Sequence, residues 1–402
     1  MDKFRKSFLA VTIITALAIT GIIAAIAYNN SPRKDSPVVF AKNDTLLELY
    51  NSSKVNTIEP KTNRTLDKQQ ANISTSEGQS YTMLRAVYVD DQKQYDASFQ
   101  WAKDNLQRSD HLYSWKFGRN ANGSYGILDT AGGKNTASDG DTDIAMSLLM
   151  AYSRWREDKY LYDAKTIISS IWDKEVVMVA GRPVLVADDL ERNDTTQVVV
   201  NPSYFSPTAY KLFAKVDSAH DWTGLVDNSY RILGDVSTSP LDATNSVGLP
   251  PDWVIMNRQT GAFSAPVSSE QTTNFGYDAM RIPFRMALDY QWFKDPRDKQ
   301  VLGKFSFLQD EWAKRHQLSA IYGHDGSIKA DYEATPAIYG GVIGYFSTMH
   351  ADTAKDIVTA KLQSLYDPNG QKWKTELGYY DDNWAWFGLG LSLHALPKII
   401  TD

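Results

Sequence analysis

The chain has 402 residues, and 42 Lys and Arg against 48 Asp and Glu give it a formal net charge of −6 at pH 7. Because a mildly acidic chain lacks the broad positive field of nucleic-acid-binding proteins, we expect no nucleic acid among its partners. The sequence contains no Cys, which excludes disulfides, Cys-based zinc sites, iron–sulfur clusters and a cysteine nucleophile.

An uncharged run at residues 8–28 follows Lys3, Arg5 and Lys6. A helix of that length spans the roughly 30 Å hydrocarbon core of a bilayer, and the basic residues favour a cytoplasmic N-terminal end. We therefore predict a single-pass membrane anchor within residues 1–30, with the rest of the chain outside the cytoplasmic membrane. Secretion after signal cleavage near Ala27 is the alternative, but the run is longer than the roughly 7–15 apolar residues of a signal peptide.

Residues 31–39 are rich in Ser, Pro and charge, which predicts a linker, and residues 40–402 show no further break in composition. With 43% hydrophobic residues the chain can build a large core, so we predict one domain over 40–402. Apolar residues recur with helical periodicity in segments of similar length joined by short polar loops. The predicted helices cover residues 94–106, 141–156, 160–171, 203–213, 222–233, 277–292, 295–316, 338–347, 352–365 and 383–394.

Apolar and polar side chains alternate within residues 177–200, and many of them are β-branched, which predicts a small hairpin or sheet. The rest of the pattern predicts an all-α fold, either a closed ring of helix pairs or an α-solenoid. Because no repeat of 34 or 40 residues is visible, the common helical repeat arrays are disfavoured.

Three acidic segments stand out, and the first contains Glu77. It lies between Ser76 and Gly78, which allow a ligand to approach the backbone closely. The alternative is a Glu in the first turn of a capped helix, and spacing alone favours that alternative.

The second acidic segment carries Asp139, Asp141 and Asp143 in alternation. A calcium-binding EF-hand is excluded, because its sixth and twelfth positions would hold Ile144 and Met150. Capping of the helix that follows needs only one Asp, so three of them indicate a further role. A structural calcium ion near Asp139 stays open.

The third acidic segment contains Asp278 and Arg281, which are three residues apart and can pair on a helix. A surface ion pair is the alternative. The apolar and aromatic residues around them favour a partly buried, functional carboxylate.

Carboxylates on three distant segments, together with 11 Trp and 22 Tyr, suit glycoside hydrolysis, which needs one protonated carboxyl and a second carboxylate. The sequence has no G-x-S-x-G or H-E-x-x-H motif and no glycine-rich nucleotide loop. We expect neither a cofactor nor a catalytic metal.

The chain resembles glycoside hydrolase family 8, once called cellulase family D. Residues 138–155, SDGDTDIAMSLLMAYSRW, are similar to the signature of that family. Residues 76–83, 201–207 and 277–290 resemble three further family segments in the same order. The resemblance implies an (α/α)6 barrel of six inner and six outer helices with a long cleft, and inverting, endo-acting hydrolysis of β-1,4-linked polysaccharide.

The resemblance also implies roles for individual residues. Glu77 would be the general acid, Asp278 the base that activates water, and Asp139 the residue that hydrogen-bonds and distorts the sugar. The glycan would be held by Trp115, Tyr204, Tyr277, Arg281 and Tyr380, and Arg281 would also orient Asp278.

Several alternatives remain within this hypothesis. The same fold could act on xylan, chitosan, mixed-linkage glucan or an amino-sugar exopolysaccharide, or bind glycans without cleaving them. Retention of both Glu77 and Asp278 argues against a non-catalytic protein. The predicted anchor and the lack of a carbohydrate-binding module favour a tethered enzyme that acts on a polysaccharide exported by its own cell. We expect a monomer.

Overall fold

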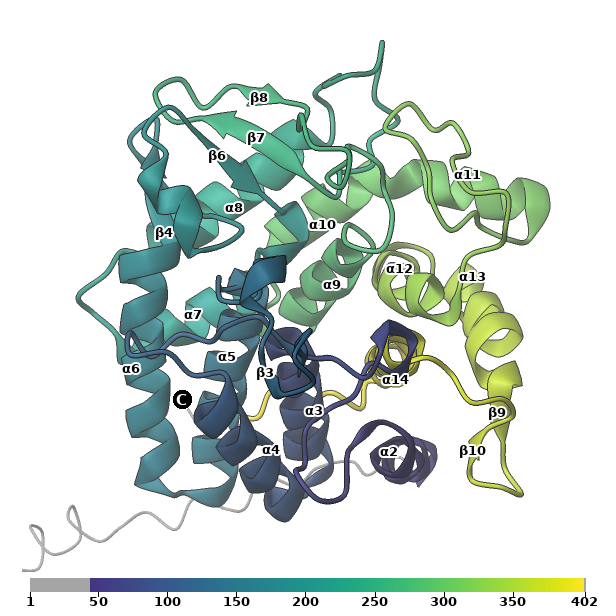
Figure 1. Cartoon of the computed structure of the whole chain (residues 1–402). Helices are drawn as coiled ribbons and strands as arrows, with labels where there is room; N and C mark the ends of the chain where they lie inside the picture. The colour runs from purple at the N-terminus through teal and green to yellow at the C-terminus, as the bar shows by residue number, and fades with distance from the viewer. Residues whose placement is uncertain (1–43, 401–402) are drawn as a thin grey trace, which may run out of the picture. The chain divides into compact units, whose positions relative to one another are not determined.

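The computed structural model describes residues 44–400, which belong to one compact unit, Phe40–Asp402 (Figure 1). The predicted anchor and linker lie outside the described residues. Among the helices of residues 44–400, none combines the length and apolar character needed to cross a bilayer.

Six helices form an inner ring in which each packs on the next (Figure 1). Ten consecutive residues of one of them, 337–346, are buried, and a helix buried on all sides belongs to a protein interior. The inner helices are α3 (Ser76–Val89), α5 (Ser138–Trp155), α7 (Pro207–Val216), α9 (Arg281–Phe293), α12 (Pro336–Met349) and α14 (Tyr379–Ser392).

Each inner helix has one outer helix packed against its outside. The outer helices are α4 (Gln92–Asn105), α6 (Asp158–Glu175), α8 (Trp222–Val236), α10 (Pro296–Leu302), α13 (Ala351–Ile357) and α2 (Asp44–Thr57). In this order they pack against α3, α5, α7, α9, α12 and α14. In α6 the buried residues Tyr160, Ala164, Ile167, Ile168 and Ile171 lie on a single stripe, as expected for a helix with one face in water. The arrangement is consistent with the predicted (α/α)6 barrel.

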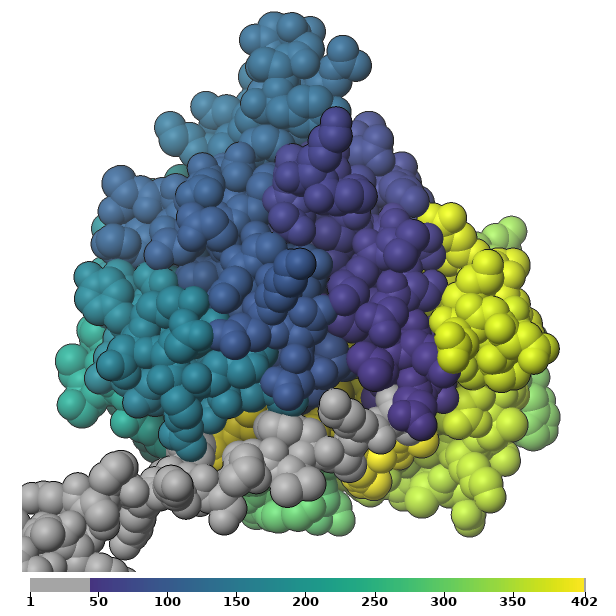
Figure 2. All heavy atoms as spheres, turned by 90° about the horizontal axis from the view of Figure 1, so that it is seen from below, coloured from purple at the N-terminus to yellow at the C-terminus, as the bar shows by residue number. Residues whose placement is uncertain are grey.

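The ring closes where the beginning and the end of the described chain meet. Figure 2 shows the first described residues, in purple, beside the last, in yellow. The indole of Trp386 in α14 donates a hydrogen bond to the carbonyl oxygen of Leu46 in α2 (2.8 Å). Between α14 and α3, Tyr81 packs edge-on against Trp384 and Phe387, with ring centroids 5.7 and 5.6 Å apart.

More strands are present than the single hairpin or sheet that the sequence predicts. Within residues 44–400 the short strands are β1 (Ser74–Thr75), β2 (Lys116–Arg119), β3 (Tyr125–Ile127), β4 (Val176–Val179), β5 (Arg182–Leu185), β6 (Gln197–Val200), β7 (Val254–Asn257), β8 (Phe263–Ser264), β9 (Tyr366–Asp367) and β10 (Lys372–Trp373). They form antiparallel sheets in the orders β1-β2-β3, β4-β5, β6-β7-β8 and β10-β9.

The segment predicted as one hairpin or sheet divides between two of these sheets. Strands β4 and β5 do form a hairpin, with Val177 opposite Val184. Strand β6 instead pairs with β7, placing Val199 opposite Ile255. Because that partner lies more than fifty residues further along the chain, local alternation could not reveal it.

The predicted helices are found, but several have different ends. The helix predicted to begin at Ser203 begins at Pro207, because proline disfavours the helical conformation in the residue before it, and a 3₁₀ turn, Pro202–Tyr204, precedes it. The helix predicted over 277–292 begins only at Arg281, so Asp278 lies in a turn.

The helices predicted over 295–316 and 352–365 are each interrupted. The first is α10 and α11 (Ser306–Arg315) joined by the 3₁₀ turn Gly303–Phe305. The second is α13 followed by the π-helical Val358–Leu362 and the 3₁₀ turn Gln363–Leu365. Three more 3₁₀ turns are Lys68–Gln70, Asp129–Ala131 and Asp189–Asn193. Helix α2 is not among the predicted helices, whereas α3, with Thr75 as its cap and Glu77 in its first turn, is the capped helix that the spacing around Glu77 favours.

Gly340 brings α12 into backbone contact with α14. A β-carbon at this position would overlap the carbonyl group of Trp384 and lie 2.9 Å from the amide nitrogen of Ala385. Since both are main-chain atoms in packed helices, we expect Gly340→Ala to lower the free energy of unfolding by about 3 kcal/mol. Urea denaturation measures this change.

Gly234 in α8 is a matched control, because a β-carbon there would meet nothing within 4 Å. Gly234→Ala should raise stability by about 0.5–1 kcal/mol, since Ala has the higher helix propensity. Equal effects of the two substitutions would contradict the close approach of α12 and α14.

Candidate active site

The three acidic residues singled out in the sequence come together at the N-terminal ends of inner helices. Glu77 is the second residue of α3, where the side chain of Thr75 caps the helix by accepting a hydrogen bond from the amide of Gly78 (2.9 Å). Asp139 is the second residue of α5 and accepts a hydrogen bond from the amide of Gly140 (2.8 Å). Asp278 lies in the turn that leads into α9.

One guanidinium group, that of Arg281, contacts all three acids. Its Nη1 donates to Glu77 Oε2 (2.9 Å) and Asp139 Oδ2 (2.8 Å). Its Nη2 donates to Asp278 Oδ1 and to Ser203 Oγ (2.7 Å). The Nε group also donates to Ser203 Oγ (3.1 Å) and to the carbonyl oxygen of Asp278 (3.2 Å). Every N–H group of Arg281 therefore has an acceptor within the protein.

The three carboxyl groups differ in their access to solvent. The side chains of Glu77 and Asp278 are 22% and 30% exposed, whereas those of Asp139 and Arg281 are 2% and 1% exposed. Arg281 is thus buried, not part of a surface ion pair. Glu77 and Asp278 can be reached by a ligand or by water from outside, while Asp139 lies deeper.

Burial raises the pKa of Glu77 to about 7, against the opposing effect of the Arg281 charge and with a smaller contribution from the Asp139 carboxylate. Burial also raises the pKa of Asp139 above its ordinary value. One guanidinium cannot neutralise three carboxylates, so the cluster retains a proton readily. Near neutral pH a substantial fraction of Glu77 is protonated.

Of the three predicted glycan-binding Tyr residues, Tyr204 packs on Arg281, and Tyr380, whose hydroxyl group interacts electrostatically with the cluster, contacts Tyr277. The guanidinium carbon of Arg281 lies 5.1 Å from the ring centroid of Tyr204. The hydroxyl group of Tyr380 donates to the carbonyl oxygen of Tyr277 (2.7 Å), and the two rings are 6.3 Å apart.

Trp115, the remaining predicted glycan-binding residue, is joined to the start of α3 without touching the acids. Its carbonyl oxygen accepts a hydrogen bond from the amide of Ser76 (3.1 Å). Its indole N–H donates to the carbonyl oxygen of Gly132 (2.9 Å), and Lys116 lies over its ring (4.9 Å). The main chain of Trp115 is therefore fixed beside the residue that precedes Glu77, while its ring is held by Gly132 and Lys116.

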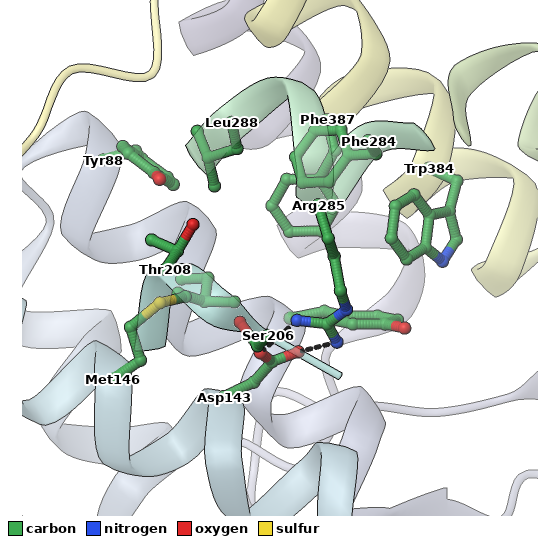
Figure 3. A pocket seen from close by; sticks show the side chains of 12 residues that line it. Tyr88, Asp143, Met146, Ser206, Thr208, Phe284, Arg285, Leu288, Trp384 and Phe387 are labelled. Atoms are coloured by element: carbon green, nitrogen blue, oxygen red, sulfur yellow. Dashed lines mark hydrogen bonds and ion pairs between the residues drawn. The ribbon is translucent and has the colours of Figure 1, made fainter. Parts of the chain in front are cut away.

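A second buried Arg–Asp pair lies one helical turn further into the ring. Arg285 donates from both Nη atoms to the two carboxylate oxygens of Asp143 (2.9 Å each). This pair joins α9 to α5, as the pair of Arg281 and Asp139 does one turn closer to the N-terminal ends of the two helices. Figure 3 shows this pair beside a small cavity enclosed by side chains from α3, α5, α7, α9 and α14. Two successive turns of α5 and α9 are thus held in one register.

No group of three or more His, Asp or Glu side chains within residues 44–400 could hold a metal ion. Asp141, which the alternation in the sequence placed with Asp139, is fully buried and accepts a hydrogen bond from the amide of Tyr113 (2.9 Å). Its role in this region is to hold the preceding loop against α5.

Comparison with known families assigns the chain to a family. A family model described as glycosyl hydrolases family 8 matches residues 39–367. The chain belongs to this family. The match indicates a glycosidase and confirms the resemblance identified in the sequence.

Two relatives of this family 8 chain are endoglucanases. One, from Escherichia coli strain K12, is 31% identical over 252 residues, which are 60% of this chain and 62% of the relative. Endoglucanase A of Acetivibrio thermocellus is 31% identical over 243 residues, 59% of this chain and 46% of the relative. The matches therefore span about half to three fifths of the relatives' lengths.

The fold of the family 8 chain is also found in a solved structure, the apo form of a β-1,3-1,4-glucanase from Paenibacillus sp. X4. The TM-score is 0.71 at 21% sequence identity, and the superposition covers 89% of this chain and 95% of the other. At this identity the likeness shows the fold alone.

Three residues that contact the cluster are not predicted from the sequence. Tyr379 donates from its hydroxyl group to Glu77 Oε1 (2.7 Å), whereas the family resemblance implies a role for its neighbour Tyr380. Ser203 accepts from Arg281, and it lies within the segment that provided Tyr204. Trp253 donates from its indole N–H to Asp278 Oδ2 (3.1 Å). Trp253 follows a Pro-Pro-Asp string without a recognised motif, so only the structure reveals it.

Tyr379→Phe tests the contact with Glu77. Since the hydroxyl group donates to the Glu77 carboxylate, its loss should raise the pKa of Glu77 further. If Glu77 acts as an acid, the fall in kcat/KM at high pH should move to higher pH, and kcat should drop by about tenfold. A pH–rate profile of the variant measures both effects. An unchanged profile would show that this hydrogen bond does not influence Glu77.

Proposed function

We propose that this chain is an endo-acting, inverting glycoside hydrolase that cleaves β-1,4-linked polysaccharide, with a cellulose-like glucan as its substrate. The observation that carries the proposal is the sharing of one buried guanidinium by three carboxyl groups, of which Glu77 has a pKa of about 7. A carboxyl group with a near-neutral pKa beside a second, solvent-accessible carboxylate is the pair that glycoside hydrolysis needs.

In this proposal Glu77 is the general acid. Its proton goes to the glycosidic oxygen as the bond to the leaving sugar breaks, so that the leaving group departs as a neutral alcohol. Burial supports the role by keeping the proton on Glu77 up to about pH 7. The hydrogen bonds from Tyr379 and Arg281 fix the direction of the carboxyl group.

Asp278 is the proposed general base. Arg281 occupies its Oδ1 and Trp253 its Oδ2, and each oxygen keeps a second lone pair that can accept a hydrogen bond from water. As the water attacks the anomeric carbon, its proton passes to Asp278, and the configuration at that carbon inverts. The 30% exposure of this side chain supports access of the water.

Asp139 is proposed to hydrogen-bond the sugar at the cleavage point, and Trp115, Tyr204, Tyr277 and Tyr380 to hold the neighbouring sugars. The N–H groups of Arg281 all have protein acceptors. We therefore propose that Arg281 acts by positioning the three acids and does not itself bind glycan, in contrast to the glycan-binding role that the family resemblance implies for it.

The test is to incubate the full chain with a soluble β-1,4-glucan and measure new reducing ends and viscosity together. An endo-acting enzyme lowers viscosity early, before many ends have formed. Proton NMR of the fresh products should show the α-anomer first, because inversion converts a β-linkage. Initial β-anomer would contradict the inverting mechanism, and no new reducing ends would contradict the glucan substrate.

Mixed-linkage glucan, xylan and chitosan belong in the same assay. The Paenibacillus protein with this fold is named a β-1,3-1,4-glucanase, which supports mixed-linkage glucan as the alternative substrate. A larger kcat/KM on one of these polymers than on β-1,4-glucan would replace the proposed substrate and keep the proposed reaction.

We also propose that the catalytic part works outside the cytoplasmic membrane, on a polysaccharide that the cell itself exports. The basic residues followed by the uncharged run at residues 8–28 support this location. Membrane fractionation with protease added to cells stripped of their wall and any outer membrane tests the location. Protection of the catalytic part from the protease would contradict it.

A further inference from the structure

Asp252 binds main-chain amides of the turn that contains Asp278. Its Oδ1 accepts hydrogen bonds from the amides of Gly276 (3.1 Å), Asp278 (3.2 Å) and Ala279 (2.7 Å). The contact is close, since a β-carbon on Gly276 would lie 2.8 Å from Asp252 Oδ2. Asp278 precedes α9, and its carbonyl oxygen accepts from the amide of Arg281 (3.1 Å), but its own N–H group has no acceptor in that helix, and Asp252 supplies one.

Trp253, the next residue, holds the side chain of the same acid. Its indole N–H donates to Asp278 Oδ2 (3.1 Å). Its ring is packed edge-on against Tyr204, with centroids 5.9 Å apart, which fixes the direction of the N–H group. Trp253 leads directly into β7, the central strand of the β6-β7-β8 sheet, so both residues are attached to a rigid element.

We propose that Asp252 and Trp253 are positioning residues that set the direction of the Asp278 carboxylate toward the attacking water. This inference rests on the proposed function, in which Asp278 is the base. Arg281 contacts Glu77, Asp139 and Asp278 alike and cannot distinguish among them. Of the three acids, the Asp252–Trp253 pair contacts only Asp278, so it controls the base separately from the acid.

The conservative variant for Asp252 follows from its environment. Burial and the neighbouring Asp278 carboxylate raise the pKa of Asp252 to about 8, so the group is largely neutral at pH 7. Asn has the same shape, is neutral and keeps an acceptor oxygen for the three amides. Asp252→Asn should therefore preserve the contact, whereas Asp252→Ala removes it.

The first test compares kcat and KM on soluble β-1,4-glucan. We expect Asp252→Ala to lower kcat by about 100-fold and Trp253→Phe by about tenfold, since small displacements of a catalytic group have effects of this size. KM should stay within about twofold, and Asp252→Asn should recover most of the lost rate. Normal kcat in Trp253→Phe, or an effect confined to KM, would overturn the proposal. If Asp252→Ala does not fold, the kcat and KM values of Trp253→Phe and Asp252→Asn still test the proposal.

A second test separates the base from the acid. An aryl glycoside with an acidic phenol as leaving group needs little help from a general acid but still needs the base. Trp253→Phe should therefore lower kcat by the same factor on this substrate and on the polymer. Glu77→Gln should lower kcat by a smaller factor on the aryl glycoside than on the polymer. A loss in Trp253→Phe that shrinks in the same way would overturn the assignment to the base.

Two control variants make the same kinds of contact away from the site. The indole N–H of Trp155 donates to Asp90 Oδ1 (2.9 Å), and Asp194 Oδ1 accepts from the amides of Thr196 (2.7 Å) and Gln197 (3.1 Å). Trp155→Phe and Asp194→Ala should keep kcat at the wild-type value. A tenfold loss of kcat in Trp155→Phe would show that the Trp253 effect is not specific.

Amide hydrogen exchange makes the inference testable apart from the reaction. In a peptide covering residues 274–281, Asp252→Ala should speed exchange, and Asp252→Asn should leave it near the wild-type rate. If the wild-type chain cleaves no glycan, the proposed function is wrong. The exchange rates still test, independently of any activity, whether Asp252 fixes the turn. Unchanged exchange in Asp252→Ala would overturn the positioning role.

Discussion

Replacing Glu77 by Gln is expected to lower kcat on soluble β-1,4-glucan by about 1,000-fold. The amide has nearly the same shape, and its one oxygen can still accept the hydrogen bond from Arg281, while its NH2 group replaces the oxygen that accepts from Tyr379. It has no acidic proton to give to the leaving oxygen. Initial rates of reducing-end release measure the effect. Glu376→Gln is the matched control, because that carboxylate is 57% exposed and pairs with Lys68 outside the site.

The pH dependence gives a second readout for Glu77. In the wild-type chain kcat/KM should fall as the pH rises through about 7, because the acid form of Glu77 is lost there. Glu77→Gln has no such group, so its residual rate should lack this descending limb. A wild-type rate that is constant from pH 6 to 9 would contradict the assignment of Glu77 as the acid.

Arg281→Met is expected to abolish activity and to lower the free energy of unfolding by about 3–5 kcal/mol at pH 7. Removal of one partner from a buried ion pair leaves uncompensated charge, and here three carboxyl groups lose their common cation. Urea denaturation gives the stability. Arg231→Met is the control, since Arg231 pairs with Asp235 on an exposed part of α8.

The loss of stability in Arg281→Met should depend on pH in a defined direction. Arg281 lowers the pKa values of Glu77 and Asp139, so without it both values rise further above those of the unfolded chain. Groups with a raised folded-state pKa stabilise at low pH and lose that contribution as the pH rises through the folded-state value. The destabilisation should therefore be smaller at pH 5 than at pH 7. A loss that grows at pH 5 would show that unpaired carboxylates are not its cause.

The sequence singles out the three acids that the structure brings together because each lies in a local motif. Glu77, Asp139 and Asp278 are marked by their small or aromatic neighbours, and the structure brings all three to one guanidinium. Helices with a clear apolar stripe, such as α6, are predicted for the same reason, since the signal repeats within a few residues.

Features that depend on distant partners could not be predicted in this way. Strand β6 forms by pairing with β7, and the contribution of Tyr379 depends on its hydrogen bond to Glu77, which lies 302 positions away. Asp252 and Trp253 have no acidic or aromatic motif around them, and their contacts exist only because β7 lies beside the turn before α9. Inner helices such as α3 also lack a polar face, so their periodicity is weak.

The closure of the helical ring links the timing of synthesis to activity. The site combines residues of α3 with residues of α14, so the proposed acid has its full set of partners only after the ribosome has released the last inner helix. Until then, the faces of α3 that will contact Trp384 and Phe387 remain uncovered and prone to aggregation. A nascent chain of this kind depends on long-range contacts and is expected to gain its catalytic centre late and all at once.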